Sequence, residues 1–370
     1  QLIIFKMGKL RKRYGESGYL IPIYSKNRAL LKRPWRNLDS NKRAIEMGFN
    51  WLFAIIAGGF ILFLAIFAAG KLISSGSITA NTLNAKNFVN IIETWEAGIA
   101  AGVKPPELKF KTDTQLYFSC SADMEQPFGK QSVSASDKIF NKEYSQQGYD
   151  VAIKNKYLFT ENMLEGKTFF PFSVGFFMPF KVADLIIFSD RTYCFYDSPE
   201  QFKIDLEQLQ LNNIQFPNKT TVCNGVNVCF KSGKACDVSV STAGRYVMKE
   251  EQRLFYDGNL IYAAIFSSPE IYKCNVERLM AKLNQLGYIY IDKIKIIERK
   301  NCRSNVENKL YQMTAITGDF TYSETVFRNL VKISEEIDVI NNDADPGCKL
   351  YKNEKKINTK AQLRIQEMAF

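Results

Sequence analysis

Eight cysteines give this 370-residue sequence its most distinctive chemistry, and histidine is absent. The cysteines are Cys120, Cys194, Cys223, Cys229, Cys236, Cys274, Cys302 and Cys348. No Cys-x-x-Cys pair occurs, and the spacing of Cys223, Cys229 and Cys236 is unlike that of a zinc site. An even number of cysteines confined to one part of a chain is typical of disulfides formed in an oxidising compartment. We therefore predict a disulfide-bonded domain of open connectivity, with buried free thiols as the alternative.

The absence of histidine excludes Ser-His-Asp and Cys-His nucleophile systems and histidine-ligated zinc. No phosphate-binding, dinucleotide-binding or nucleophile-elbow motif is present either. The adjacent acids Glu250-Glu251 and Glu335-Glu336 are expected on solvated surfaces, and the acidic run at 341–345 lacks the glycine and terminal glutamate of a calcium loop. We assign no catalytic, cofactor-binding or metal-ligating residue and predict that the protein is not an enzyme. A hydrolase based on a carboxylate pair is the third hypothesis.

Hydrophobic patterning predicts the elements that would position the cysteines. Residues 108–118 alternate between apolar and polar, which predicts a strand leading to Cys120. Ser-Pro-Glu at 198–200 and at 268–270 is typical of a helix start. Three apolar-faced helices are expected after residue 270, with Cys274, Cys302 and Cys348 near their ends. The expected fold class is α+β, a mixed sheet domain beside a C-terminal helical bundle.

Three apolar runs lead to further strand predictions. The aromatic stretch 169–180 is interpreted as a pair of core strands rather than as an exposed partner-binding surface. Residues 185–188 and 192–196 are expected to form a hairpin around Asp190-Arg191 that contains Cys194. Residues 260–266 are expected to be a strand paired with residues 253–256 across the turn Asp257-Gly258-Asn259.

The positive charge of the chain, +11 in total, is concentrated at one end. Residues 1–50 contain twelve Lys or Arg and three Asp or Glu, so the remainder is close to neutral. Tyrosine, leucine, isoleucine and tryptophan are mixed with these basic residues. That mixture suits an anionic inner-leaflet membrane surface, contacted by residues 1–43, better than a nucleic-acid groove.

A long apolar run follows the basic segment directly. Residues 47–70 contain no Asp, Glu, Lys or Arg. As a helix they would span about 36 Å, which is enough to cross a lipid bilayer. Six basic residues precede the run closely and only Lys71 follows it before Lys86, so the N-terminus is predicted in the cytoplasm. The run lies too far from the start for a cleaved secretory signal, and a signal-anchor fits better.

The expected organisation follows from these patterns. It comprises a basic cytoplasmic tail (1–46), a transmembrane helix (47–73), a juxtamembrane stalk or helix that could continue the membrane helix (74–106), a β-rich ectodomain (107–267), a helical part (268–350) and a polar tail (351–370). Asn218 heads the sequence's single N-glycosylation sequon, on the side that would be exported.

The segment 41–53, NKRAIEMGFNWLF, resembles the N-terminal region of archaeal type IV pilin-like proteins. It is also similar to single-pass membrane proteins of small-genome archaea, as are the fragments 178–181, 272–274 and 278–280. The pilin resemblance implies a peptidase cut before the helix and a glutamate that pairs with the neighbouring subunit. Glu46 occupies the matching position, although no Lys-Gly or Arg-Gly junction precedes it.

We therefore predict a single-pass cell-membrane protein with an extracellular, disulfide-bonded domain and a structural or interaction role in the cell envelope. The lipid bilayer is its expected partner, together with other envelope proteins or further copies of itself. The alternative is a type IV pilin-like filament subunit whose membrane helix forms the filament core.

Overall fold

The N-terminal apolar run and the segment after it form a single helix, α1 (Arg43–Ile99), in the computed structural model of the chain. The structure describes residues 43–99, 107–122, 128–138, 143–217, 223–231, 236–299, 302 and 305–352. The chain divides into two compact units, residues 1–65 and residues 66–370. The helix continues through Ser74, Ser75 and Gly76 without interruption, so the apolar run and the juxtamembrane segment belong to one helix.

The first sheet has six strands in the order β3-β2-β1-β5-β6-β4. Its strands are β1 (Leu108–Ser121), β2 (Lys130–Asp137), β3 (Val151–Ile153), β4 (Tyr157–Phe159), β5 (Met163–Phe177) and β6 (Lys181–Ser189). Only the β4–β6 pair is parallel, so the sheet is mixed as expected. The predicted strand before Cys120 is confirmed as β1, in which Thr114, Leu116 and Phe118 are buried between less buried neighbours.

The second sheet also has six strands, in the order β12-β11-β10-β9-β7-β8. Its strands are β7 (Tyr193–Tyr196), β8 (Ile214–Gln215), β9 (Val226–Cys229), β10 (Val238–Ser241), β11 (Tyr246–Lys249) and β12 (Gln252–Phe255). Strands β8, β7, β9 and β10 run parallel to one another, and β11 and β12 are antiparallel. The fold is therefore α+β with two mixed sheets rather than one.

The predicted hairpin around Asp190-Arg191 is wrong, because its two strands belong to different sheets. β6 pairs with β5 and β4, whereas β7 pairs in parallel with β8 and β9. The Asp190 carboxylate accepts a hydrogen bond of 2.8 Å from the Glu165 backbone N–H on β5. The chain between β6 and β7 is thus held to a neighbouring strand and passes from one sheet to the other.

The helices are α2 (Glu200–Gln208), α3 (Leu260–Phe266), α4 (Pro269–Glu298), α5 (Val306–Gly318) and α6 (Glu324–Asp343). Both Ser-Pro-Glu sequences open helices as predicted. Ser268 caps α4 by accepting a hydrogen bond from Ile271 N–H, whereas α2 begins at Glu200 after Pro199 without a side-chain cap. The prediction of a strand at 260–266 is wrong, since this segment is α3. Six of its seven residues are buried, and periodicity cannot distinguish so short an apolar run from a strand.

The β-rich region therefore ends at Phe255, and the helical region begins at Leu260 rather than at residue 268. β12 turns back onto β11, with Tyr246 opposite Phe255. The turn between them is formed by Glu250 and Glu251, both at positive φ.

Alternate side chains of the first sheet enter two different cores. Tyr157, Phe159 and Leu185 contribute to a core that includes the second sheet and helices α3 to α6. Their neighbours Leu158 and Ile186 contribute to a core with α1. Burial on both faces explains why β4 and β6 are nearly continuous apolar runs. The aromatic run 169–180 belongs to these cores, which confirms its interpretation as core, but the expected pair of strands is wrong because residues 169–177 all lie in β5.

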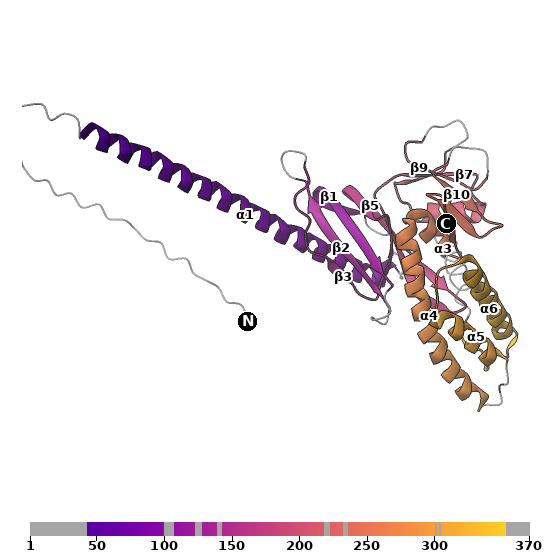
Figure 1. Cartoon of the computed structure of the whole chain (residues 1–370). Coiled ribbons are helices and arrows are strands. Elements are labelled where there is room, and N and C mark those ends of the chain that lie inside the picture. The colour runs from indigo at the N-terminus through magenta and orange to yellow at the C-terminus, as the bar shows by residue number, and fades with distance from the viewer. Residues whose placement is uncertain are drawn as a thin grey trace, which may run out of the picture. The chain divides into compact units, whose positions relative to one another are not determined.

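Helix α4 is the element that connects the parts of the larger unit. It contacts β1, β4 and β6 of the first sheet and β12 of the second. Figure 1 shows α4, α5 and α6 side by side (orange to yellow), and α5 packs against both neighbours. Gly287 on α4 permits this approach, because a Cβ there would lie 2.5 Å from Thr314 Cγ2 on α5.

A substitution pair tests the α4–α5 contact. Gly→Ala within a helix normally stabilises by up to about 1 kcal/mol. We expect Gly287→Ala to lower the melting temperature instead, because the new methyl group collides with Thr314. Thr314→Ser removes the colliding Cγ2 and should restore stability in the double variant relative to Gly287→Ala alone. A melting temperature raised by Gly287→Ala would contradict the packing.

Candidate membrane anchor and disulfide-bonded domain

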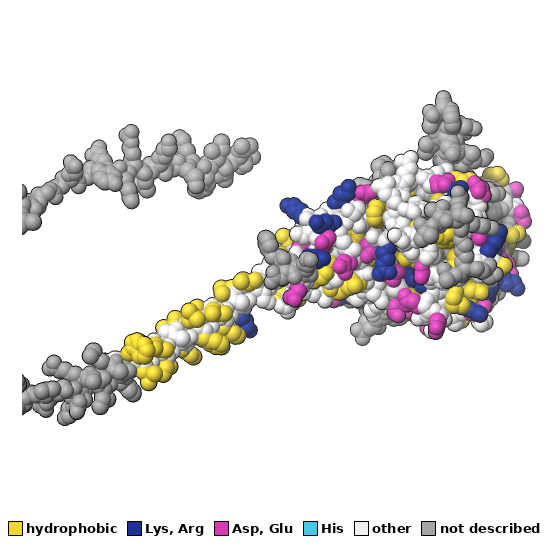
Figure 2. Space-filling model, turned by 90° about the horizontal axis from the view of Figure 1, so that it is seen from above, with side chains coloured by type: hydrophobic (Ala, Val, Ile, Leu, Met, Phe, Trp, Pro, Cys, Tyr) yellow, Lys and Arg dark blue, Asp and Glu magenta, His cyan; other side chains and the backbone are white. Residues whose placement is uncertain are grey.

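The first part of α1 carries apolar side chains around its whole circumference. The stretch Asn50–Glu93 contains an 18-residue window apolar and long enough to cross a membrane, and none of that window is buried. Trp51 is 70% exposed and Ile61 is 66% exposed. Figure 2 shows hydrophobic side chains (yellow) along the visible face of the first part of α1. No side of the helix in this region is polar enough to suit water.

The later part of α1 is docked through polar side chains. The Asn81 carboxamide donates to Ser145 Oγ at 2.7 Å and to the Gln146 carbonyl at 2.6 Å. Asn84 donates to the Asp137 carboxylate at 2.6 Å, where β2 ends. Thr82 Oγ1 accepts from the Tyr149 N–H at 2.9 Å. These bonds fix the helix against β2 and the segment that follows it.

An apolar face of the same helical stretch completes the docking. Phe88 packs edge-on against Phe118 of β1 and Phe188 of β6, with ring centroids 5.8 and 5.1 Å apart. The buried residues of this face are Ala85, Phe88, Val89 and Ile92. Residues 81–92 therefore form part of the core of the first sheet instead of a stalk that stands apart from it.

All eight cysteines are paired, so the alternative of free thiols is wrong. The four disulfides are Cys120–Cys274, Cys194–Cys223, Cys229–Cys236 and Cys302–Cys348. Three of them join cysteines that are 7 to 46 residues apart in sequence. Cys120–Cys274 joins β1 to α4 across 154 residues. In the chain-entropy account a closure of that length stabilises the fold by about 5 kcal/mol when it acts alone.

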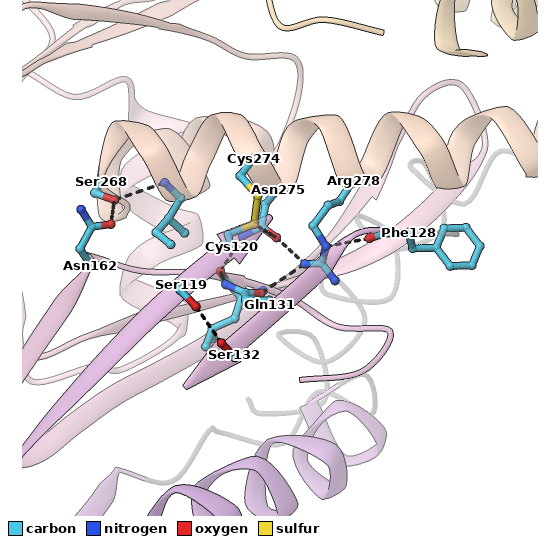
Figure 3. The surroundings of a disulfide bond; sticks show 12 residues. Ser119, Cys120, Phe128, Gln131, Ser132, Asn162, Ser268, Cys274, Asn275 and Arg278 are labelled. Atoms are coloured by element: carbon cyan, nitrogen blue, oxygen red, sulfur yellow. Dashed lines mark hydrogen bonds between the residues drawn. A yellow bond between two sulfur atoms is a disulfide. The ribbon is translucent and has the colours of Figure 1, made fainter. Parts of the chain in front are cut away.

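A buried polar cluster lies beside the Cys120–Cys274 bond (Figure 3). Its centre is Arg278 on α4, which is only 2% exposed. Arg278 donates to the carbonyls of Phe128 and Lys156, at 2.8 and 3.1 Å. It also donates to the side-chain oxygens of Asn275 and Gln131, at 2.6 and 3.3 Å. The cluster thus connects α4 to the segments before β2 and β4.

The neighbours of Arg278 also stabilise its buried positive charge. Its guanidinium lies 5.0 Å from the centre of the Tyr157 ring, and its hydrogen-bond acceptors are neutral carbonyl and amide oxygens. Burial lowers the pKa of Arg278, which still stays protonated at neutral pH. Burial raises the pKa of Tyr157 to about 12, against the opposing effect of Arg278. This arrangement holds elements of the fold together.

The remaining residues singled out from the sequence belong to separate elements or lie outside the described part of the chain. Glu46 lies in the first turn of α1, and Asn218 lies outside the described residues. Residues 1–42, which include most of the basic tail, lie outside them as well. The Asn341 carboxamide holds the backbone of Leu350 and Tyr351, so it is committed to the fold rather than to a cation.

The adjacent glutamates of α6 also take separate partners. Glu335 accepts from Arg245 at 2.8 Å, and Glu336 pairs with Lys309 at 2.6 Å. The Lys309 hydrogen bond lowers the pKa of Glu336. Each carboxylate is therefore a member of an ion pair between elements, and the two do not face a common site.

A scan against protein-family models, a search of curated proteins and a search of solved structures each returned no match.

A substitution in the buried cluster tests its structural role. We expect Arg278→Met to destabilise the protein by about 3 kcal/mol, because it leaves buried carbonyl and amide oxygens without donors. Arg299→Met, at the exposed end of the same helix, should stay within about 0.5 kcal/mol of the wild type. Thermal unfolding of the unreduced chain in detergent measures both. Equal melting temperatures for the two variants would refute the assignment.

Proposed function

We propose that the protein is a single-pass cell-envelope protein, anchored by α1, whose disulfide-bonded domain acts outside the cytoplasm as a structural or interaction component. The observation that carries the proposal is the uncovered apolar part of α1, followed in the same helix by a part built into the domain core. The hydrocarbon core of a bilayer accommodates apolar side chains that are unfavourable in water. A helix can cross this core because its backbone hydrogen bonds are satisfied within the helix.

Two features support the proposed orientation. The basic residues concentrate before the apolar run, which favours a cytoplasmic N-terminus. All four disulfides follow the run, and such bonds persist in oxidising compartments. Residues 1–43 would then meet the anionic inner leaflet, and the domain would face outward.

The short sequence between the apolar run and the domain supports a role in interactions at the membrane. Only Lys71, Leu72 and Ile73 separate the apolar run from Ser74, whose hydroxyl bonds Gln146 Oε1 at 2.8 Å. A domain attached so closely would be held at the membrane surface, within reach of other envelope proteins. We propose such proteins, rather than a substrate undergoing chemistry, as its partners.

A filament subunit of the type IV pilin kind is the second candidate. The feature that favours it is a run of small residues on uncovered α1, including Gly58, where an added Cβ would meet nothing within 4 Å. Small residues let helices approach closely in a membrane or filament core. Mass spectrometry of the native N-terminus separates the candidates, because cleavage between Arg43 and Met47 supports the filament and an uncut basic tail supports the anchor.

Charges placed in the apolar stretch test the anchor. We expect Ile61→Arg/Leu64→Arg to abolish retention in carbonate-washed membranes, since each arginine near a helix centre costs about 2.5–3.5 kcal/mol of insertion. The matched control is Ile296→Arg/Val339→Arg, at positions on α4 and α6 that are each 59% exposed. The control should remain in the membrane fraction. Membrane retention of the Ile61→Arg/Leu64→Arg variant would rule out the anchor.

The interaction role has its own test. Cells expressing the full chain are treated with an amine-reactive crosslinker that does not cross membranes, and the protein is then purified in denaturing detergent. We expect discrete species of higher mass that contain the outward domain. An exclusively monomeric product would count against an interaction role without bearing on the anchor.

A further inference from the structure

A cavity of about 320 Å³ opens where the β5–β6 turn, α4 and the segment after α6 meet. Its size falls within the range of small-molecule sites. Its walls combine aromatic rings with the ends of lysine side chains, among them Phe180, Tyr290, Tyr351, Lys181, Lys293 and Lys352. These residues come from three separate parts of the chain, so the cavity is a product of the tertiary fold.

The aromatic wall is a packed and fixed surface. The rings of Phe180 and Tyr290 are stacked with centroids 3.9 Å apart, and Tyr351 meets Phe180 edge-on at 5.8 Å. The Tyr351 hydroxyl donates to Asp338 Oδ1 at 2.7 Å, which orients its ring. Asn341 holds the backbone of Tyr351. These contacts hold the wall in place, and Lys293 Nζ lies 5.6 Å from the centre of the Tyr290 ring.

The lysines give the cavity a positive charge. Within the described part of the chain, no aspartate or glutamate lines it. Lys181 bonds the nearby Asp184 carboxylate at 2.9 Å, and Lys293 donates to the Leu350 carbonyl. Three lysines therefore line the cavity, and the nearby Asp184 carboxylate is bonded to one of them, Lys181.

We propose that this cavity is a binding site for a small organic anion, with a phosphate or carboxylate group at Lys181 and Lys352 and an apolar or aromatic body against Tyr290. Lysine ammonium groups bind such anions through charge-assisted hydrogen bonds, and aromatic walls bind flat apolar groups. The site is independent of the proposed membrane anchor, because every residue that forms it follows residue 176.

Phenyl phosphate is the probe, and saturation-transfer NMR on the full chain in deuterated detergent is the measurement. We expect saturable binding that weakens about tenfold or more in Lys181→Gln/Lys352→Gln, because two charge-assisted contacts are removed. The control is Lys295→Gln/Lys349→Gln. Lys295 lies on α4 outside the cavity and pairs with Asp292 at i,i+3 spacing, as Lys181 pairs with Asp184. The control should change the affinity less than about twofold.

Two comparison ligands and one further variant complete the test. Benzyl alcohol, which lacks the charge, should bind far more weakly than phenyl phosphate, and benzoate reports whether a carboxylate replaces the phosphate. Tyr290→Leu should weaken phenyl phosphate but leave inorganic phosphate unchanged. Absence of saturable phenyl phosphate binding, equal binding of benzyl alcohol, or an affinity unaffected by Lys181→Gln/Lys352→Gln would each overturn the proposal.

Discussion

One helix has to satisfy two different surroundings, and the rest of the structure depends on how it does so. The first part of α1 exposes apolar side chains on every side, and the part from Asn81 to Ile92 is built into the core of the first sheet. The core of the first sheet depends on the docked part, because Phe88 packs against Phe118 and Phe188 and Asn81 holds the segment after β2.

Helix α4 performs the corresponding task within the domain. It touches both sheets, is joined to β1 by the Cys120–Cys274 bond and carries the buried Arg278. In the folded protein, backbone carbonyls and amide oxygens replace the water that would otherwise hydrate Arg278. This replacement is favourable only while all of these acceptors are held in place. The disulfide and the buried cation thus reinforce one another at the point where distant parts of the chain meet.

Sequence patterns predicted much of this fold, and the failures have physical causes. Alternation predicted β1, the Ser-Pro caps predicted α2 and α4, and cysteine usage predicted the disulfides. The strand prediction for Leu260–Phe266 was wrong because a segment buried on all sides shows no hydrophobic periodicity. The docking of Asn81 and the burial of Arg278 left no local signal, since their partners other than Asn275 lie 56 to 150 residues away in sequence. The lysine cavity left no local signal either, because its residues come from three separate segments of the chain.

The compartment of the domain is the central claim, and the redox state of the cysteines in cells tests it most directly. Growing cells are quenched in acid, exposed thiols are alkylated, and the unreduced protein is digested and analysed by mass spectrometry. The account predicts that no cysteine carries the label and that peptides are linked as Cys120–Cys274, Cys194–Cys223, Cys229–Cys236 and Cys302–Cys348. Alkylated cysteines in the folded, membrane-bound protein would contradict it, because they would place the domain in a reducing compartment.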